Sequence, residues 1–187
     1  MSAPGSVIAL DAALMAWIEF LEPSTPSVLA LATPNPGWSV ADVVNHVVAV
    51  TRKFTAFADG TTDRPRTPPG DLLGTDHLAA LRDAADRART AWHDADPDRI
   101  CHLPFGSFPA AIAAGINLFD LLGHGWDVEM ATGTAFRCPD AVWAAGLAAA
   151  RQVIGPERDA RHYAPELPAP PGASARIRLL RYLGRPA

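Results

Sequence analysis

The feature that most restricts the fold is a stretch at residues 108–133 that reads as a helix with apolar side chains on nearly every side. Such a helix has to be surrounded by other elements, because the hydrophobic effect drives its surface out of water. Its segment NLFDLLGHGWDV nevertheless carries Asn117, Asp120, His124 and Asp127 at spacings of three, four and three. On a helix these spacings bring all four side chains to one face, so we expect a polar site inside a mostly apolar interior.

Proline and glycine residues divide the rest of the chain into further helices. The expected helices span about residues 7–22, 39–60, 75–94, 108–133, 139–155 and 175–184, with Pro109 at the first position of the fourth. The stretches at 61–74, 95–107 and 156–174 are expected to be loops. Four long helices joined by modest loops predict an all-α fold, a four-helix bundle with additional C-terminal helices, in one domain that covers residues 1–187.

The start of the second expected helix has a specific signature. Ser39 is a good N-cap and Asp42 follows three residues later, which is the acidic form of a capping box. Trp38 before the cap can pack on Val43 as a hydrophobic staple. The run VVNHVVAV is β-branched and would suit a buried strand by propensity alone, but the capping box and the length of the segment favour a helix.

Composition and charge argue against several classes of function. The net charge is −4 over 187 residues and no lysine or arginine cluster forms a stripe, so nucleic acid is not expected as the main partner. The longest uncharged stretch, residues 103–119, contains helix breakers and polar residues and is a poor membrane span, and the N-terminus lacks the pattern of a secretory signal. Cys101 and Cys138 have no CxxC spacing, so we expect two reduced thiols in the cytoplasm.

Three side chains could form a metal site: His46 on the second expected helix, and Asp120 with His124 on the fourth. Facing helices of a bundle commonly supply metal ligands, and zinc and its neighbours bind imidazole and carboxylate groups. Three protein ligands would leave a position for water or substrate. From spacing alone, two other interpretations stay open: His46 as a hydrogen-bonded core histidine, and Asp120 with His124 as a structural hydrogen-bonded pair.

Four further residues are candidates for the surroundings of this site. Asn45 could hold a water molecule near the metal or satisfy the backbone of another helix. Arg52 could bind an anionic substrate at the mouth of a pocket or remain solvated, and Asn117 could line that pocket. Asp127 could orient His124, or it could form a salt bridge, with Arg52 for example, that ties two helices together.

The other residues of chemical interest are expected to have structural or surface roles. Trp126 is expected to pack in the core, and the tail arginines Arg176 and Arg178 to lie on a solvated helix face. The remaining histidines are expected at the surface: His77, His93, His102 and His162. Cys101 beside His102 does not form a recognisable catalytic pair, and nothing matches a nucleophile elbow, a P-loop or a dinucleotide fingerprint.

Two blocks of sequence resemble a known family. PGWSVADVVNHVV combines a Pro-Gly-Trp turn with Asn-His on a helix, and LFDLLGHGWDVEMATG combines an acidic residue with a following His-x-Trp-Asp and an Ala-Thr-Gly ending. Both blocks are similar to the DinB-like family, in its mycothiol-dependent maleylpyruvate isomerase branch. The closing LLRYLGRPA is similar to the tail of short, single-domain members. Lys53 is the one lysine against fifteen arginines, a bias typical of GC-rich genomes such as actinobacterial ones.

The resemblance implies a DinB-type four-helix bundle that holds a divalent metal, zinc or nickel in character, and iron would also accept such ligands. The ligands that it implies are His46, Asp120 and His124. This sequence departs from the isomerase in two respects. The isomerase has a glutamate where this chain has Asp120, and it has a second, C-terminal domain with a catalytic arginine that this chain is too short to contain.

The resemblance also implies a low-molecular-weight thiol as cosubstrate, because the metal of such relatives holds a thiolate. We therefore expect a cytoplasmic, metal-dependent isomerase or transferase that acts on a small electrophilic or thiol-conjugated molecule. No nucleic acid or membrane partner is expected, and a homodimer is compatible with the sequence. Two alternatives stay open: a metal-stabilised binding protein without turnover, and a bundle that has lost its metal.

Overall fold

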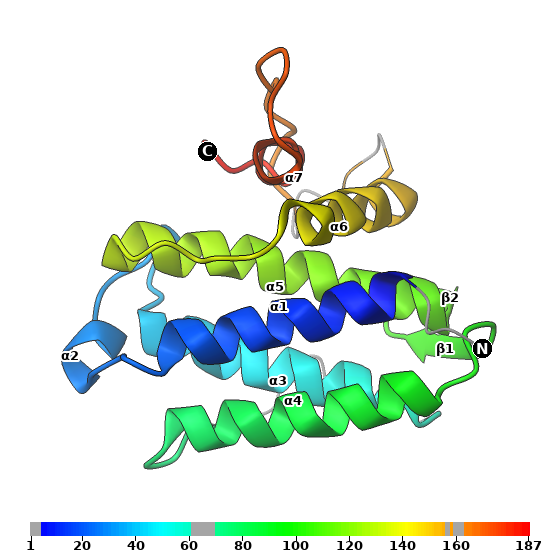
Figure 1. Cartoon of the computed structure of the whole chain (residues 1–187), viewed down its shortest axis with the longest axis horizontal. Coiled ribbons are helices and arrows are strands. Elements are labelled where there is room, and N and C mark those ends of the chain that lie inside the picture. The colour runs from blue at the N-terminus through cyan, green and yellow to red at the C-terminus, as the bar shows by residue number, and fades with distance from the viewer. Residues whose placement is uncertain (1–4, 61–69, 156–157, 159–162) are drawn as a thin grey trace.

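The structure, a computed structural model, describes residues 5–60, 70–155, 158 and 163–187 and is mostly helical (Figure 1). Its long helices are α1 (Gly5–Leu21), α3 (Val40–Ala58), α4 (His77–Asp94), α5 (Ala110–Thr132) and α6 (Asp140–Val153). The shorter elements are α2 (Pro26–Leu29), α7 (Ala175–Tyr182) and a hairpin of β1 (Ile100–Leu103) and β2 (Gly106–Pro109). The predicted all-α class is confirmed.

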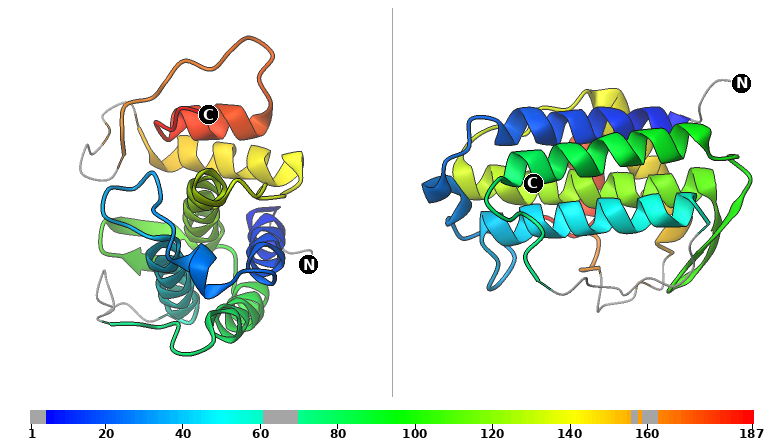
Figure 2. Two further views of the ribbon diagram at one scale, coloured as in Figure 1. Left: turned by 90° about the vertical axis from the view of Figure 1, so that its left-hand side faces the viewer. Right: turned by 90° about the horizontal axis from the view of Figure 1, so that it is seen from below.

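The helices α1, α3, α4 and α5 form a bundle, and α6 and α7 lie across one side of it. The left view of Figure 2 looks nearly along the four bundle helices and shows α6 and α7 stacked above α5. Helix α5 contacts α1, α3 and α6, and α7 packs on α6. The bundle with additional C-terminal helices is thus arranged around α5.

Helix α5 is buried because its sequence is apolar on nearly every side. Fifteen of its 23 residues are buried, Asn117 and Asp127 among them. The helix ends as predicted at Gly133, whose φ of 68° is left-handed. Its start differs slightly from the prediction: Pro109 is the N-cap rather than the first helical residue, since it still belongs to β2.

The capping box at the start of α3 is confirmed. The Asp42 amide donates to the Ser39 hydroxyl at 3.2 Å, and the Ser39 amide donates to the Asp42 carboxylate at 2.8 Å. The two bonds satisfy amides that the first turn of a helix leaves without partners. The pKa of Asp42 is held below its usual value by the Ser39 hydroxyl, which donates to the carboxylate at 2.6 Å, and by the Ser39 amide. The β-branched run after the cap is therefore helical, and most of its valines lie in the core.

Two elements were not predicted. Residues 100–109 form an antiparallel hairpin, in which Cys101 pairs with Phe108 and Leu103 with Gly106. Residues 100–107 were expected to be loop, and residues 108 and 109 to begin the next helix. Its strands have four residues each, which is too short for an alternating pattern to be distinguished from a loop. Cys101 and Leu103 are buried, and β1 contacts α3 and α5. The other unpredicted element is the single turn α2, which precedes the site described below.

The other two predicted loops, 61–74 and 156–174, agree with the structure where it describes them. Residues 70–74 and 163–174 form turns and extended segments without helix or strand. The remainder of the two Pro-rich stretches, residues 61–69, 156, 157 and 159–162, lies outside the described residues, and so does His162. Among the described helices, none combines the length and the apolar character that crossing a membrane requires.

We expect Gly115→Ala to lower the free energy of unfolding by about 1–3 kcal/mol. An added Cβ would lie 2.7 Å from Cβ of Ala149, so α5 and α6 would have to separate. This clash outweighs the gain of about 1 kcal/mol that alanine normally brings over glycine in a helix. Urea denaturation measures the difference. Gly155→Ala is the matched control, because an added Cβ there meets no atom within 4 Å. A Gly115→Ala protein as stable as the wild type would contradict the close packing.

Candidate metal centre

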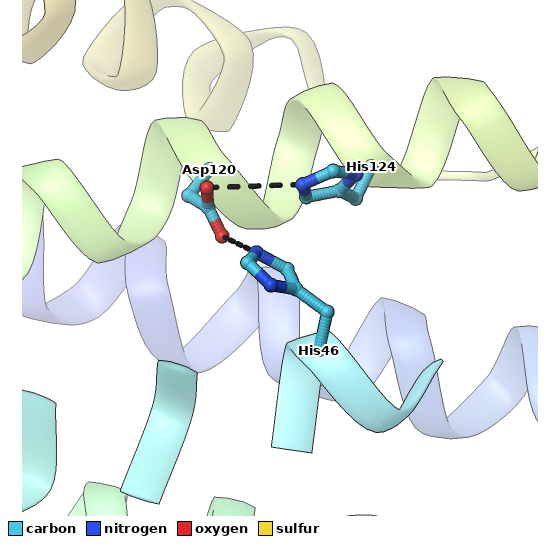
Figure 3. Close-up of side chains that lie close together, drawn as sticks. All are labelled: His46, Asp120 and His124. Carbon is cyan, nitrogen blue, oxygen red and sulfur yellow. Dashed lines mark ion pairs between the residues drawn. The ribbon is translucent and has the colours of Figure 1, made fainter. Parts of the chain in front are cut away.

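His46, Asp120 and His124 lie together between α3 and α5 (Figure 3). Nε2 of His46 is 3.3 Å from Oδ2 of Asp120, and Nε2 of His124 is 3.8 Å from Oδ1 of the same carboxylate. One ligand atom from each residue lies within 4.8 Å of the other two. The side chains are 29%, 30% and 13% exposed, in the same order, so the cluster lies near the surface of the bundle. The structure thus brings together the three residues that the sequence singled out.

The electrostatics of the cluster favour the charged forms of both Asp120 and His46. Burial alone would raise the pKa of the Asp120 carboxyl, but the Coulomb attraction of His46 and His124 holds that pKa below its usual value. Burial would likewise lower the pKa of His46, but the charge of Asp120 raises it. Asp120 is therefore ionised at neutral pH and can act as an anionic ligand.

Nε2 of His46 and Oδ2 of Asp120 are buried and face each other as an ion pair, and among the described residues neither atom has a hydrogen-bond partner. A buried polar atom left in this way costs about 1–3 kcal/mol. The two atoms lie 3.3 Å apart, and a cation held by both would satisfy them together. Two imidazoles and one carboxylate are also the donor set of many zinc sites with an open position. The residues present therefore fit a divalent metal.

Asp127 orients His124. Its carboxylate oxygen lies 2.9 Å from Nδ1 of His124. Burial would raise the pKa of Asp127, but hydrogen bonds from Arg185 and His124 keep it far below its usual value, so the carboxylate can only accept. Nδ1 of His124 must then carry a proton. In the neutral imidazole the lone pair is therefore on Nε2, the nitrogen next to Asp120, where it can bind a metal ion.

Asp127 is itself held by two other parts of the chain. The side-chain amide of Asn35, in the loop before α3, donates to it at 2.9 Å. Arg185, in the C-terminal tail, donates Nε at 2.9 Å and Nη2 at 2.8 Å. The guanidinium can lie there because Gly123 has no side chain: a Cβ at that position would be 3.1 Å from it. The carboxylate is only 1% exposed and fully bonded.

Trp38 lies against both histidines. Its ring centroid is 5.3 Å from that of His46 and 6.1 Å from that of His124, and its plane is nearly parallel to the His124 ring, at 11°. The imidazoles are 4.7 Å apart and edge-on to each other. The Pro-Gly-Trp turn therefore places an aromatic ring directly beside two of the candidate ligands.

The other residues predicted around the site have different positions. Asn45 does not point into the cluster; it accepts from the Leu72 amide at 2.7 Å and donates to the Gly70 carbonyl, which fastens that segment to α3. Arg52 pairs with Asp83 at 3.5 Å, so the suggested pairing of Asp127 with Arg52 is wrong. Asn117 is completely buried, and its amide group has no hydrogen-bond partner among the described residues.

Most of the predicted surface and core positions are correct. Trp126 is buried, and His93, His102 and Arg178 are exposed. His77 is only partly exposed and its Nε2 is buried, because the residue begins α4 beside the segment that Asn45 fastens. One prediction needs correction: Arg176 is not simply solvated but donates to Glu129 at 2.6 Å. Cys101 and Cys138 are free thiols, as expected.

Sequence reasoning missed Asn35, Arg185 and the ring contacts of Trp38. Trp38 lies in the block PGWSVADVVNHVV and Arg185 in the closing LLRYLGRPA, both of which carry the family resemblance, whereas Asn35 immediately precedes the first block. The sequence patterns did not indicate, however, toward which residues these side chains point. The contact of Arg185 with Asp127 joins residues 58 positions apart, and no spacing rule predicts such a contact.

The fold and the cluster define a class of protein: an all-α bundle in which two neighbouring helices bring two imidazoles and a carboxylate to one point. Comparison with protein families narrows this class. Residues 10–129 match the model of the mycothiol maleylpyruvate isomerase N-terminal domain, and the chain belongs to this family. The resemblance inferred from the two sequence blocks is thereby confirmed.

The curated relatives include two proteins of Mycobacterium tuberculosis, MT0763 of strain CDC 1551/Oshkosh and Rv0738 of strain H37Rv, both described as uncharacterized. Each is 28% identical to this chain over 158 residues, which cover 82% of this chain and 82% of the relative. No solved structure matches the chain significantly.

We expect Asp127→Ala to lower the free energy of unfolding by about 3–5 kcal/mol, because it would leave Arg185, Asn35 and His124 without their shared acceptor. Urea denaturation of the metal-free protein measures this loss. Glu22→Ala is the matched control: it removes another carboxylate that pairs with an arginine, but with both side chains about half exposed or more. The control is expected to change stability little. Equal effects of the two substitutions would refute the structural role of Asp127.

Proposed function

We propose that the chain is a cytoplasmic, divalent-metal-dependent enzyme that acts on a small molecule, as an isomerase or transferase that uses a low-molecular-weight thiol. The observation that carries this proposal is the convergence of His46, Asp120 and His124. Membership of the mycothiol maleylpyruvate isomerase N-terminal domain family supports both a metal and a thiol. Two unpaired cysteines are consistent with a reducing compartment.

In this proposal each residue of the centre has a distinct role. His46 and His124 present Nε2 to the ion, and Asp120 supplies the anionic oxygen. Asp127 keeps the proton on Nδ1 of His124, so that this imidazole binds in its neutral form. A bound zinc ion would supply Lewis acidity and lower the pKa of a coordinated thiol or water toward neutrality. Zinc suits this donor set, and nickel or iron would be accepted by the same ligands.

A second candidate function is a metal-stabilised binding protein without turnover. One observation favours it: a groove of about 900 Å³ lies along α3 and α4, lined by Arg52, Asp83 and Thr90 among others, and the three candidate ligands are not part of its lining. In that case the metal would stabilise the bundle and a small molecule would bind elsewhere. Catalytic turnover of a substrate would favour the enzyme, and binding without turnover would favour the binding protein.

We expect the wild-type chain to bind about one zinc ion, and His46→Ala, Asp120→Ala and His124→Ala each to weaken that binding at least about 100-fold, because each removes one of three ligands. Metal analysis after dialysis measures the zinc content, and calorimetric titration measures the affinity. Zinc at 100 times its dissociation constant should also stabilise the wild type by about 2.7 kcal/mol. His93→Ala, an exposed histidine on α4, is the control and should bind as the wild type does. Full zinc retention in the three variants would refute the site.

We expect the zinc-loaded protein to convert a small electrophile such as maleylpyruvate in the presence of mycothiol, and His46→Ala and His124→Ala to lose that activity. Without its ion the site has no means of activating the thiol. Product formation with and without the thiol is followed by chromatography, with His93→Ala as the active control. A zinc-loaded wild type that forms no product with any thiol and electrophile tested would support the binding protein instead.

A further inference from the structure

Trp38 differs from the other tryptophans of the chain. The sequence contains five, and Trp17, Trp92, Trp126 and Trp143 are all buried, at 6% exposure or less. Trp38 is 37% exposed. The exposed part of this ring forgoes some of the roughly 2–3 kcal/mol that full burial of a large aromatic side chain brings. An exposed ring beside a cluster of candidate ligands therefore calls for a functional explanation.

The backbone of Trp38 is held by three hydrogen bonds within one turn. Its amide donates to the Asn35 carbonyl at 3.0 Å, and its carbonyl accepts from the amide and the hydroxyl of Thr33, both at 2.9 Å. Ser39, the next residue, is the N-cap of α3. The side chain of Asn35 in the same turn reaches Asp127. The turn that positions the indole is thus tied to the residue that orients His124.

The surroundings of the cluster indicate what kind of molecule could bind there. A divalent ion on two neutral imidazoles and the Asp120 carboxylate keeps one net positive charge, which suits a monoanionic head group. The charge of Arg185 does not add to this, because its guanidinium is paired with Asp127. Arg52 is paired with Asp83. The indole of Trp38 lies against both imidazoles and is partly exposed, so it offers an apolar surface next to the candidate ligands.

We infer that Trp38 is a specificity-determining residue of this centre: the metal binds the anionic head group of a small molecule, and the exposed part of the indole binds a flat apolar group attached to that head. The ligands selected carry an apolar group next to the donor that binds the metal, and bare inorganic anions are bound less tightly. The inference rests on the proposed metal site and adds the class of its ligand.

Two hydroxamates test this inference, because they have the same metal-binding head and differ in the attached group. Acetohydroxamate carries a methyl group and benzohydroxamate a phenyl ring. Both are titrated calorimetrically into the full-length, zinc-saturated protein. We expect the wild type to bind benzohydroxamate about fivefold more tightly, which is the size of one aromatic stacking contact. In Trp38→Ala the two affinities should become equal, and in Trp38→Phe most of the preference should remain.

The control is Phe105→Ala, which removes another half-exposed aromatic ring, in the turn of the hairpin. Figure 1 shows the hairpin at the end of the bundle opposite α2. This variant should keep the wild-type preference. The inference is overturned if the wild type does not discriminate between the two hydroxamates, or if Trp38→Ala still prefers the phenyl ring.

Zinc content is measured first in every variant, so that the failure of this inference is distinguished from the failure of the metal site. A wild type that binds no zinc refutes the metal site and this inference with it. If Trp38→Ala loses zinc, the same comparison is made in Trp38→Leu, which keeps apolar bulk against the imidazoles but has no flat ring. A retained phenyl preference in Trp38→Leu also overturns the inference and leaves Trp38 as a support for the histidines.

Discussion

The structure depends on the burial of α5 around nearly its whole circumference. Helices α1, α3 and α6 each cover part of it, and the hydrophobic effect that holds them there is the largest favourable contribution to folding. Small residues allow this enclosure, since Gly115 lets α6 come close enough for its Ala149 to fill the space of a side chain. A polar group left unpaired inside such an interior is costly, and this cost explains the arrangement around Asp127.

Asp127 is where this requirement is met most fully. One buried carboxylate accepts from the turn before α3, from His124 on α5 and from Arg185 in the tail. Three segments distant in sequence are thereby fixed around one imidazole. Asp120, one helical turn before His124, has no such set of partners, and Oδ2 of its carboxylate is left facing His46. Asp127 therefore supports His124, whereas Asp120 is available to bind a metal ion.

Much of the fold could be predicted because its signals are local. The capping box at Ser39, the stop at Gly133 and the apolar spacing of α1, α3 and α5 depend only on neighbours within a few residues. The hairpin at 100–109 and the turn α2 were missed because four-residue elements carry too little pattern. In the site, the spacing of Asp120 and His124 placed them on one face. Their proximity to His46 was one of several possibilities from the residues alone, and the family resemblance favoured it.

The sequence by itself determined the helical segments, the polar face of the buried helix and the family. Each of these follows from periodicity, capping or residue type along short stretches of chain. The tertiary structure decided which polar residues meet. Packing of α3 on α5 brings His46 to Asp120, the tail brings Arg185 to Asp127, and the Pro-Gly-Trp turn brings Trp38 to both imidazoles. Contacts of this kind join residues that are far apart along the chain, and they exist only once the apolar faces of the helices have been buried together.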